Sequence, residues 1–178
     1  MYPLDTNIEE LFIAYRHDVY KFLIYYTRTF DVEDLVQETF IKALKGLRGF
    51  QGDSNVRTWL FSIARNVAID YQRKKRPIVQ FVKESKLVNV ASNAKTPEQV
   101  VELTETTKFV LNVLGNLNPR FREVIVLRGV HDLSSKETAR ILGWTTTKVN
   151  VTFHRAIKAA QELLIQESGG FLENGMDG

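Results

Sequence analysis

The stretch Ser134–Asn150, SSKETARILGWTTTKVN, decides the fold that the sequence predicts for its second half. Ser134 is a preferred helix N-cap, and Gly143 tolerates the left-handed conformation in which helices often end. Ala139 is small enough to let two helices cross closely, and Val149 supplies a branched side chain for the angle between them. This spacing predicts two helices joined by a short turn, a helix-turn-helix.

The helices that flank this motif are also predicted from local signals. Asn118–Pro119 can start a helix before it, because proline suits the first helical position. Thr145 or Thr146 can cap the helix after the turn, which we expect to end near Leu164. That last helix carries polar and basic residues, as is typical of a helix-turn-helix that binds DNA. They are Lys148, Asn150, His154, Arg155 and Lys158.

The amino-terminal part predicts two amphipathic helices. Apolar residues recur at steps of three and four within residues 8–30, and Asn7 is a suitable N-cap for this stretch. Asp31 is the expected N-cap of the second helix, whose first turn then places two carboxylates at the positive end of the helix dipole. Its apolar positions continue to Leu47.

A third helix and a linker are expected next. Ser54 or Asn55 can cap the helix, and Pro77 is expected to end it, because the proline ring interrupts the hydrogen-bond ladder. The helical period is lost over residues 77–96, which indicates a linker, with a small strand or packed segment as the alternative. Thr96–Gln99, TPEQ, then has the pattern of a capping box that opens a further helix.

These signals predict an all-α protein made of two small helical domains. The first is a bundle of three to four helices, and the second contains the helix-turn-helix. The predicted boundaries are residues 1–76 and 97–167 for the domains, 77–96 for a flexible linker and 168–178 for a disordered tail.

Charge is distributed unevenly along the 178 residues, whose formal net charge is +3. Residues 1–45 carry five basic and eight acidic side chains, a balance of −3, whereas residues 57–76 carry six and one, a balance of +5. Residues 120–160 carry eight and three, again +5. Two basic blocks indicate two places where a polyanion is met, with the acidic surface left for another partner. Basic side chains that only solvate helix faces are the alternative.

Several classes of function are disfavoured by what the sequence lacks. There is no cysteine, and the three histidines lie far apart, so we expect no metal site and no cofactor. No Gly-rich phosphate loop or positioned nucleophile occurs, and we do not expect an enzyme. The first residues lack a basic flank followed by an apolar core, and no apolar run approaches the length of a membrane span. We therefore expect a cytoplasmic protein that does not insert into membranes.

Five stretches in order carry a resemblance to a known family. They are EDLVQETFIKAL, TWLFSIARNVAID, RKKRP, LNPRFREVIVLRGVHDLSSKETARILGW and FHRAIKAAQELL. Together they resemble the bacterial RNA polymerase sigma factors of the extracytoplasmic-function (ECF) subfamily of the sigma-70 family. The resemblance covers nearly the whole chain, and it implies two helical modules, region 2 and region 4, joined by a linker. It implies an alternative sigma factor that binds core RNA polymerase and promoter DNA.

The resemblance also implies roles for individual residues. In region 2 a helix docks on clamp helices of the polymerase, and the matching residues are Asp34, Gln37, Glu38 and Phe40. The minus 10 element is held by Ser54, Asn55 and Asn66 at its flipped bases and by Arg65, Arg73, Lys74, Lys75 and Arg76 at its phosphates. The minus 35 element is read by Asn150, Val151, His154 and Arg155, with Thr146, Thr147 and Lys148 near phosphates. Asn150, Val151 and Thr152 stand where a Lys-Ser-Arg run is usual, so the promoter sequence cannot be copied from a relative.

Other interpretations remain at the level of the sequence. An anti-sigma factor is an expected further partner, because such inhibitors are frequent in the family. A stand-alone helix-turn-helix regulator with an amino-terminal sensing or dimerisation domain is the main alternative, and a nuclease or hydrolase is a more distant one. Trp59 can stack on a base, but its place on the apolar side of its helix favours packing in the core.

Overall fold

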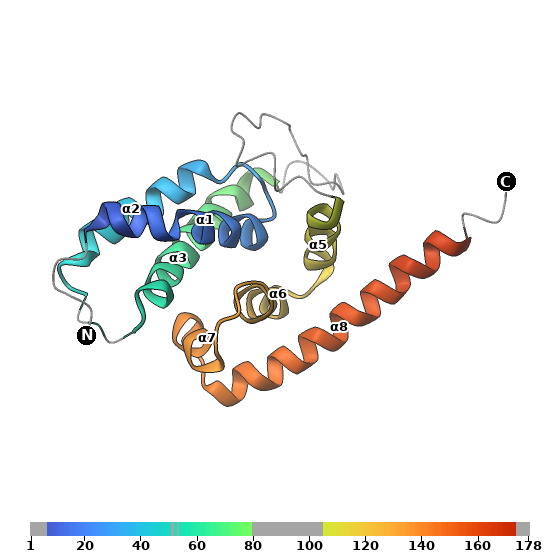
Figure 1. Cartoon of the computed structure of the whole chain (residues 1–178). Coiled ribbons are helices and arrows are strands. Elements are labelled where there is room, and N and C mark those ends of the chain that lie inside the picture. Colours follow the sequence, from blue (N-terminus) through green and yellow to red (C-terminus); the bar gives the residue numbers. More distant parts are fainter. Residues whose placement is uncertain (1–6, 51, 53, 80–104, 174–178) are drawn as a thin grey trace.

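Helices form all of the regular structure in the part of the chain that the computed structural model describes, residues 7–50, 52, 54–79 and 105–173. The amino-terminal group consists of α1 (Ile8–Thr27), α2 (Glu33–Leu47) and α3 (Val56–Val79), which pack against one another in all three pairs (Figure 1). The carboxyl-terminal group consists of α5 (Glu105–Asn116), α6 (Pro119–Ile125), the π-helical turn η1 (Val126–Val130), α7 (Ser135–Leu142) and α8 (Thr146–Glu173). The predicted all-α fold is confirmed.

Asparagine side chains cap two helices of the amino-terminal group. The Oδ1 atom of Asn7 accepts a hydrogen bond from the backbone N–H of Glu9 at 3.2 Å, at the start of α1. The Oδ1 atom of Asn55 accepts one from the N–H of Arg57 at 2.8 Å, at the start of α3. Of the two predicted caps for α3, it is therefore Asn55 that makes the bond, and one orphan N–H is satisfied at each helix start.

Two helix boundaries predicted for this group are wrong. α2 begins at Glu33 with Val32 as its N-cap residue, and no side chain caps it, whereas the sequence predicts Asp31 in that role. Val32 is fully buried, so its packing in the core fixes where the helix begins. α3 continues past Pro77 to Val79. The proline removes only one hydrogen bond near the end of a 24-residue helix, and the helix survives that loss.

The helix-turn-helix is confirmed in its local detail. The Oγ of Ser134 accepts a hydrogen bond from the N–H of Glu137, whose carboxylate in turn accepts from the N–H of Ser134, so that a full capping box starts α7. Gly143 ends the helix with φ at 65°. Ala139 and Val149 are both buried where α7 and α8 meet.

α8 is longer than the sequence predicts. It starts at a Thr145 cap, whose Oγ1 accepts a hydrogen bond from the N–H of Lys148 at 3.2 Å. The predicted end near Leu164 is wrong, because strong helix formers surround that position. α8 continues to Glu173 and so includes residues 168–173, which the sequence assigns to a disordered tail, even though two of these are glycines. The predicted capping box at Thr96–Gln99 lies outside the described residues.

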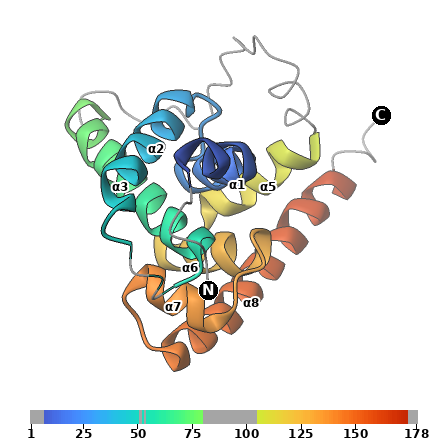
Figure 2. The ribbon, with the colours of Figure 1, turned by 60° about the vertical axis from the view of Figure 1, so that its left-hand side comes forward.

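The two groups of helices share one continuous apolar core. α1 packs against η1 and α3 packs against α7, and Figure 2 shows α6, α7 and the first part of α8 lying below α1 and α3. His131 is only 4% exposed, with its ring centroid 5.7 Å from that of Phe22 and 4.9 Å from that of Phe61. Burying one such phenylalanine contributes about 1.5–3 kcal/mol. Apolar burial therefore holds the two groups together.

Trp59 packs within the amino-terminal group, as the apolar side of its helix predicts. Its ring lies 4.9 Å from that of Phe50, and it is partly buried against the core. Gly46 leaves room for it, because a Cβ added there would come within 3.2 Å of the indole. The indole therefore supports the end of α2.

Candidate interfaces for DNA and polymerase

The amino-terminal half of α8 presents an exposed polar face. Val149 and Ala156 are fully buried and fix which side of the helix meets the core. The opposite side carries the residues expected at the minus 35 element, and every one of them is exposed. They are Thr146, Thr147, Lys148, Asn150, Val151, His154 and Arg155. A helix with this arrangement can lie in a DNA major groove by its first turns.

Two side chains outside α8 hold part of that face, and the sequence analysis missed both. Asn150 accepts hydrogen bonds at Oδ1 from the Oγ of Ser135 at 2.6 Å and from Nη1 of Arg128 at 3.2 Å. The guanidinium carbon of Arg128 also lies 4.6 Å from the centroid of the Phe153 ring. A stacking position beside an aromatic face fixes an arginine that would otherwise be free to rotate.

The exposed side of α3 carries several of the residues expected at the minus 10 element. Asn66 and Arg73 lie two helical turns apart and are both exposed, as are Lys74 and Lys75. Arg73 pairs with Asp70 at 3.1 Å, but its side chain is 75% exposed, so the pair is weak and easily exchanged for a phosphate. The ammonium group of Lys75 lies over a tyrosine ring at 4.5 Å. Asn66 and Arg73 therefore share one strip along α3, and Lys74 and Lys75 extend the basic charge around the end of the helix.

Two further residues expected at that element, Ser54 and Asn55, stand apart from the strip. Asn55 uses its side-chain oxygen as the helix cap, and Ser54 beside it is half-buried. The side chain of Arg76 lies outside the described residues, although its backbone belongs to α3. The amide nitrogen of Asn55 and one lone pair of its oxygen are therefore left for a base edge.

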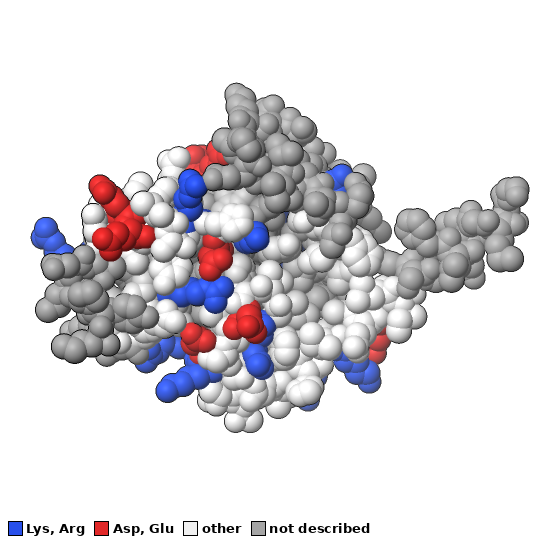
Figure 3. Space-filling view, in the orientation of Figure 1, with Lys and Arg blue, Asp and Glu red and all other residues white. Residues whose placement is uncertain are grey.

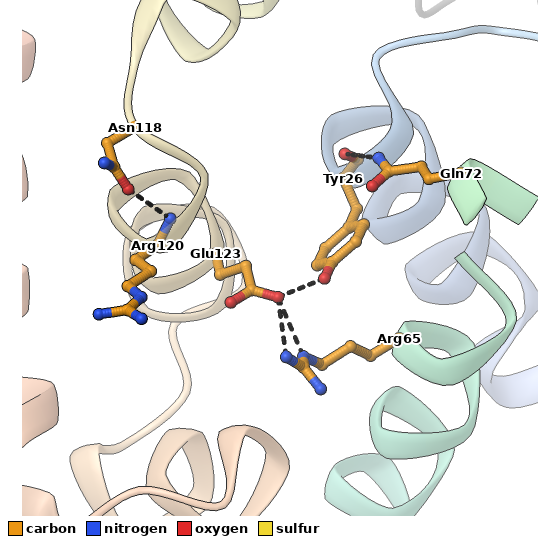
Figure 4. A network of polar contacts seen from close by, with 6 residues as sticks. All are labelled: Tyr26, Arg65, Gln72, Asn118, Arg120 and Glu123. Atoms are coloured by element: carbon orange, nitrogen blue, oxygen red, sulfur yellow. Dashed lines mark hydrogen bonds and ion pairs between the residues drawn. The ribbon is translucent and has the colours of Figure 1, made fainter. Parts of the chain in front are cut away.

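Arg65 faces the carboxyl-terminal helices instead of the open surface. Its Nε and Nη2 atoms donate to Oε1 of Glu123 on α6 at 3.1 and 2.9 Å. The hydroxyl of Tyr26 on α1 donates to the same oxygen, and Figure 4 shows the three side chains converging from three helices. Burial, reinforced by the Glu123 carboxylate, raises the pKa of the tyrosine. The sequence groups Arg65 with the minus 10 contacts, but here it forms a partly buried contact between the two modules.

A second polar contact joins the modules through the capping box. The hydroxyl of Thr58 on α3, which is fully buried, donates to Oε1 of Glu137 at 3.2 Å. The same carboxylate accepts from the hydroxyl of Ser134 at 2.6 Å, and this bond is the main reason that the pKa of Glu137 is lowered. One residue therefore both starts α7 and binds it to α3.

An apolar groove of about 650 Å³ runs between α1 and α2. Gln37 and Phe40, two of the residues expected to meet polymerase, line it together with Ile41 and Leu44. Phe40 is only 6% exposed and packs edge to face against Phe12 at 4.9 Å, so it forms a wall of the groove and does not project from the surface.

The acidic residues beside the groove differ in their surroundings. Asp34 is exposed, whereas Glu38 pairs with Lys42 at 2.9 Å on its own helix. Figure 3 shows acidic side chains gathered at the end of the molecule where α1 begins, and basic side chains along the lower edge near α7 and the start of α8. Elsewhere on this face acidic and basic side chains are interspersed, so the separation of charge is only partial there (Figure 3).

Within the described residues there is no group of three or more His, Cys, Asp or Glu side chains that could hold a metal ion. In the same part of the chain, no helix combines the length and the apolar character needed to cross a membrane.

Comparisons with known proteins agree with this architecture. The family model of sigma-70 region 2 matches residues 11–78, and that of sigma-70 region 4 matches residues 110–159. The chain is 37% identical over 154 residues to the RNA polymerase sigma factor YlaC of Bacillus subtilis, covering 84% of this chain and 87% of that protein. It is 33% identical over 171 residues to the ECF RNA polymerase sigma factor SigX of the same organism, covering 92% and 88%.

Solved structures give the same result. The sigma factor RpoE in complex with the anti-sigma factor NepR from Bartonella quintana superposes with a TM-score of 0.71 at 28% identity, covering 88% of this chain and 95% of that one. CnrH in complex with the cytosolic domain of CnrY has a TM-score of 0.67 at 24% identity over 92% of each chain, which supports the fold.

Two helical modules, one with a helix-turn-helix and the other with an apolar groove, are the framework of a transcription initiation factor. The chain belongs to the ECF sigma factors of the sigma-70 family. Its function is that of an alternative sigma factor, which directs RNA polymerase to promoters. Nothing in these comparisons supports a stand-alone regulator.

Proposed function

We propose that core RNA polymerase docks on the groove between α1 and α2 and on the face of α2 beside it. The observation that carries this proposal is the exposure of Ile41 and Leu44, each 53% exposed on a helix whose other side is buried in the core. Asp34 and Gln37 extend the same face at steps of three and four. The surface is therefore apolar in its centre with an acidic residue at one end, and it suits a partner with a complementary basic rim.

The members of this surface contribute differently. Phe40 supports it from below, since it is buried against Phe12. Glu38 contributes less charge than Asp34, because Lys42 already compensates it. Ile41 and Leu44, which the sequence analysis did not select, supply the exposed apolar area.

The same proposal gives promoter DNA the two basic surfaces. The exposed half of α8 enters the major groove of the minus 35 element, and the strip on α3 with Asn66 and Arg73 meets the minus 10 element. Linking both modules to one polymerase makes the second DNA contact effectively intramolecular, which strengthens promoter binding without new contacts. Arg65 joins the minus 10 contacts once its bond to Glu123 is broken.

An anti-sigma factor is a further proposed partner, by analogy with RpoE, whose solved structure contains NepR. Catalysis belongs to the polymerase in this scheme, and the chain itself performs none. The bacterial cytoplasm, where polymerase and promoters meet, is the compartment in which we expect it to act.

Replacing both Ile41 and Leu44 by Asp tests the docking surface. We expect binding to purified core polymerase to weaken at least tenfold, because charges at the centre of an interface must be desolvated without partners. Affinity is measured by fluorescence titration, and promoter-specific transcription in vitro should fall with it. Phe109→Asp is the matched control, since Phe109 is a similarly exposed apolar residue (46%) on α5, and it should bind core normally. Equal losses in both variants, or none in either, would reject the surface.

A further inference from the structure

The amide of Asn150 is held in one orientation by its neighbours. Its Oδ1 atom lies 3.2 Å from Nη1 of Arg128 and 2.6 Å from the hydroxyl of Ser135. A guanidinium group only donates hydrogen bonds, so the amide atom that faces Arg128 must be the oxygen and not the nitrogen. The Arg128 contact therefore decides between the two ways in which the amide could be turned.

Both acceptor positions of that oxygen are occupied. A carbonyl oxygen has two lone pairs, and here one receives the arginine N–H and the other the serine O–H. The Nδ2 atom keeps both of its N–H donors, with no partner among the described residues. Because Asn150 is exposed on the polar face of α8, these two donors are what the side chain can offer to DNA.

Arg128 and Ser135, which orient the amide, are themselves fixed by their surroundings. Arg128 belongs to η1, is half-buried, and stacks on Phe153 at 4.6 Å. Ser135 is the first residue of α7, directly after the capping box, and is also half-buried. Rotating the amide would break both bonds and leave Arg128, whose Nε already has no partner, with a further unpaired donor.

We propose that Asn150 reads its base as a hydrogen-bond donor only, and that Arg128 and Ser135 are the positioning residues that make it so. This inference rests on the proposed function, in which α8 reads the minus 35 element. An asparagine usually selects adenine by accepting from N6 while donating to N7, which needs a free amide oxygen. Guanine presents two acceptors in the major groove, O6 and N7, and thymine presents one, O4, whereas adenine presents the N7 acceptor beside its N6 amino donor. Asn150 therefore selects guanine first and thymine second, and it disfavours adenine and cytosine because their amino groups would face the amide N–H groups.

The test is a selection of promoter DNA with core polymerase and the full-length chain. The minus 35 element is randomised, the rest of the promoter is fixed, and bound DNA is sequenced. The position read by Asn150 is the one whose preference disappears with Asn150→Ala. We expect guanine there for the unaltered chain, with adenine selected against by roughly tenfold or more. Selection of adenine at that position, or no position that depends on Asn150, would overturn the proposal.

Variants of the positioning residues separate this idea from a merely structural role. Ser135→Ala and Arg128→Met each free one lone pair of the amide oxygen, so adenine should become accepted and the guanine-to-adenine ratio should fall several-fold at that position alone. Arg120→Met, which removes an exposed arginine from α6, should leave base choice unchanged. Ser135→Ala changes only a hydroxyl and leaves the Ser134 cap intact, so it remains informative if Arg128→Met folds poorly. Unchanged preferences in both variants would overturn the proposal, whereas failure to select any promoter with core would overturn the proposed function beneath it.

Discussion

α8 and α3 both carry residues expected to meet promoter DNA, yet they present them in different ways. On α8 all seven expected residues are exposed, including His154 and Arg155. On α3 the basic strip is open, but Arg65 is bound to Glu123 of the other module. In this arrangement region 4 covers part of region 2, so one DNA-binding surface is open while the other is partly engaged inside the molecule.

Replacing Glu123 by Lys should disrupt the contact between the two modules, and we expect it to have the largest effect on the free energy of unfolding. The Arg65 and Glu123 side chains are only 20% and 15% exposed, so a second cation beside the arginine would leave uncompensated charge in a poorly solvated site. We expect a loss of about 3–5 kcal/mol in the free energy of unfolding, measured in urea. Arg73→Gln is the control, because its exposed pair with Asp70 should contribute less than about 1 kcal/mol.

The milder change Glu123→Gln tests whether the same contact limits the binding of DNA. It should release Arg65 for phosphate and increase the affinity for a single-stranded minus 10 oligonucleotide, with a steeper salt dependence. An unaltered affinity, together with an unaltered free energy of unfolding for the Lys variant, would mean that the contact neither holds the modules nor masks the arginine.

Acid should weaken the contact between the modules through His131. Burial between α1, α3 and η1, with Arg57 nearby, lowers the pKa of His131 to about 4, whereas an unfolded histidine has a pKa near 6.5. Above pH 6.5 both states are neutral and stability is complete. Between pH 6.5 and 4 the unfolded state binds a proton at His131 that the folded state does not bind. The free energy of unfolding therefore falls as pH falls, by up to about 3 kcal/mol.

The variant His131→Phe isolates this effect from other titrating groups. Glu137, whose pKa is lowered, also loses stabilising bonds in acid, so the slope of the unaltered chain alone is not diagnostic. We expect the difference in unfolding free energy between the two proteins to change steadily between pH 6.5 and 4. A constant difference across that range would show that folding does not lower the pKa of His131.

Thr58→Val should give the smallest effect. It keeps the volume of a fully buried side chain but removes the hydroxyl that donates to Glu137 at 3.2 Å, at a cost of about 1 kcal/mol in urea unfolding. Thr147→Val, at an exposed position on α8, should cost close to nothing. If the two variants are equally stable, the modules are held by their apolar core without this bond.

Features determined within a few residues could be predicted from the sequence. The Ser134 cap, the left-handed Gly143 and the buried Val149 depend on neighbours in the chain, and so does the exposed face of α8. The predicted Asp31 cap failed because burial of Val32 outweighs a local capping preference. Local signals therefore describe the helix-turn-helix well and the start of α2 poorly.

Contacts between distant residues could not be predicted. Tyr26 and Glu123 are 97 positions apart, and Arg65 and Glu123 are 58 apart, so no periodicity or spacing connects them. The bonds from Arg128 and Ser135 to Asn150 likewise depend on how η1, α7 and α8 pack. The sequence could nominate Asn150 as a contact, but only the fold shows which of its atoms is free.

The burial of Phe22 and Phe61 against His131 also has a consequence during synthesis. The amino-terminal helices leave the ribosome first, and the aromatic face that includes Phe61 stays uncovered until His131 has been translated, 70 residues later. At roughly 5–20 residues per second that interval lasts for several seconds. During that time the nascent chain exposes an apolar surface to which chaperones can bind. The surface is covered only when η1 and His131 pack against it.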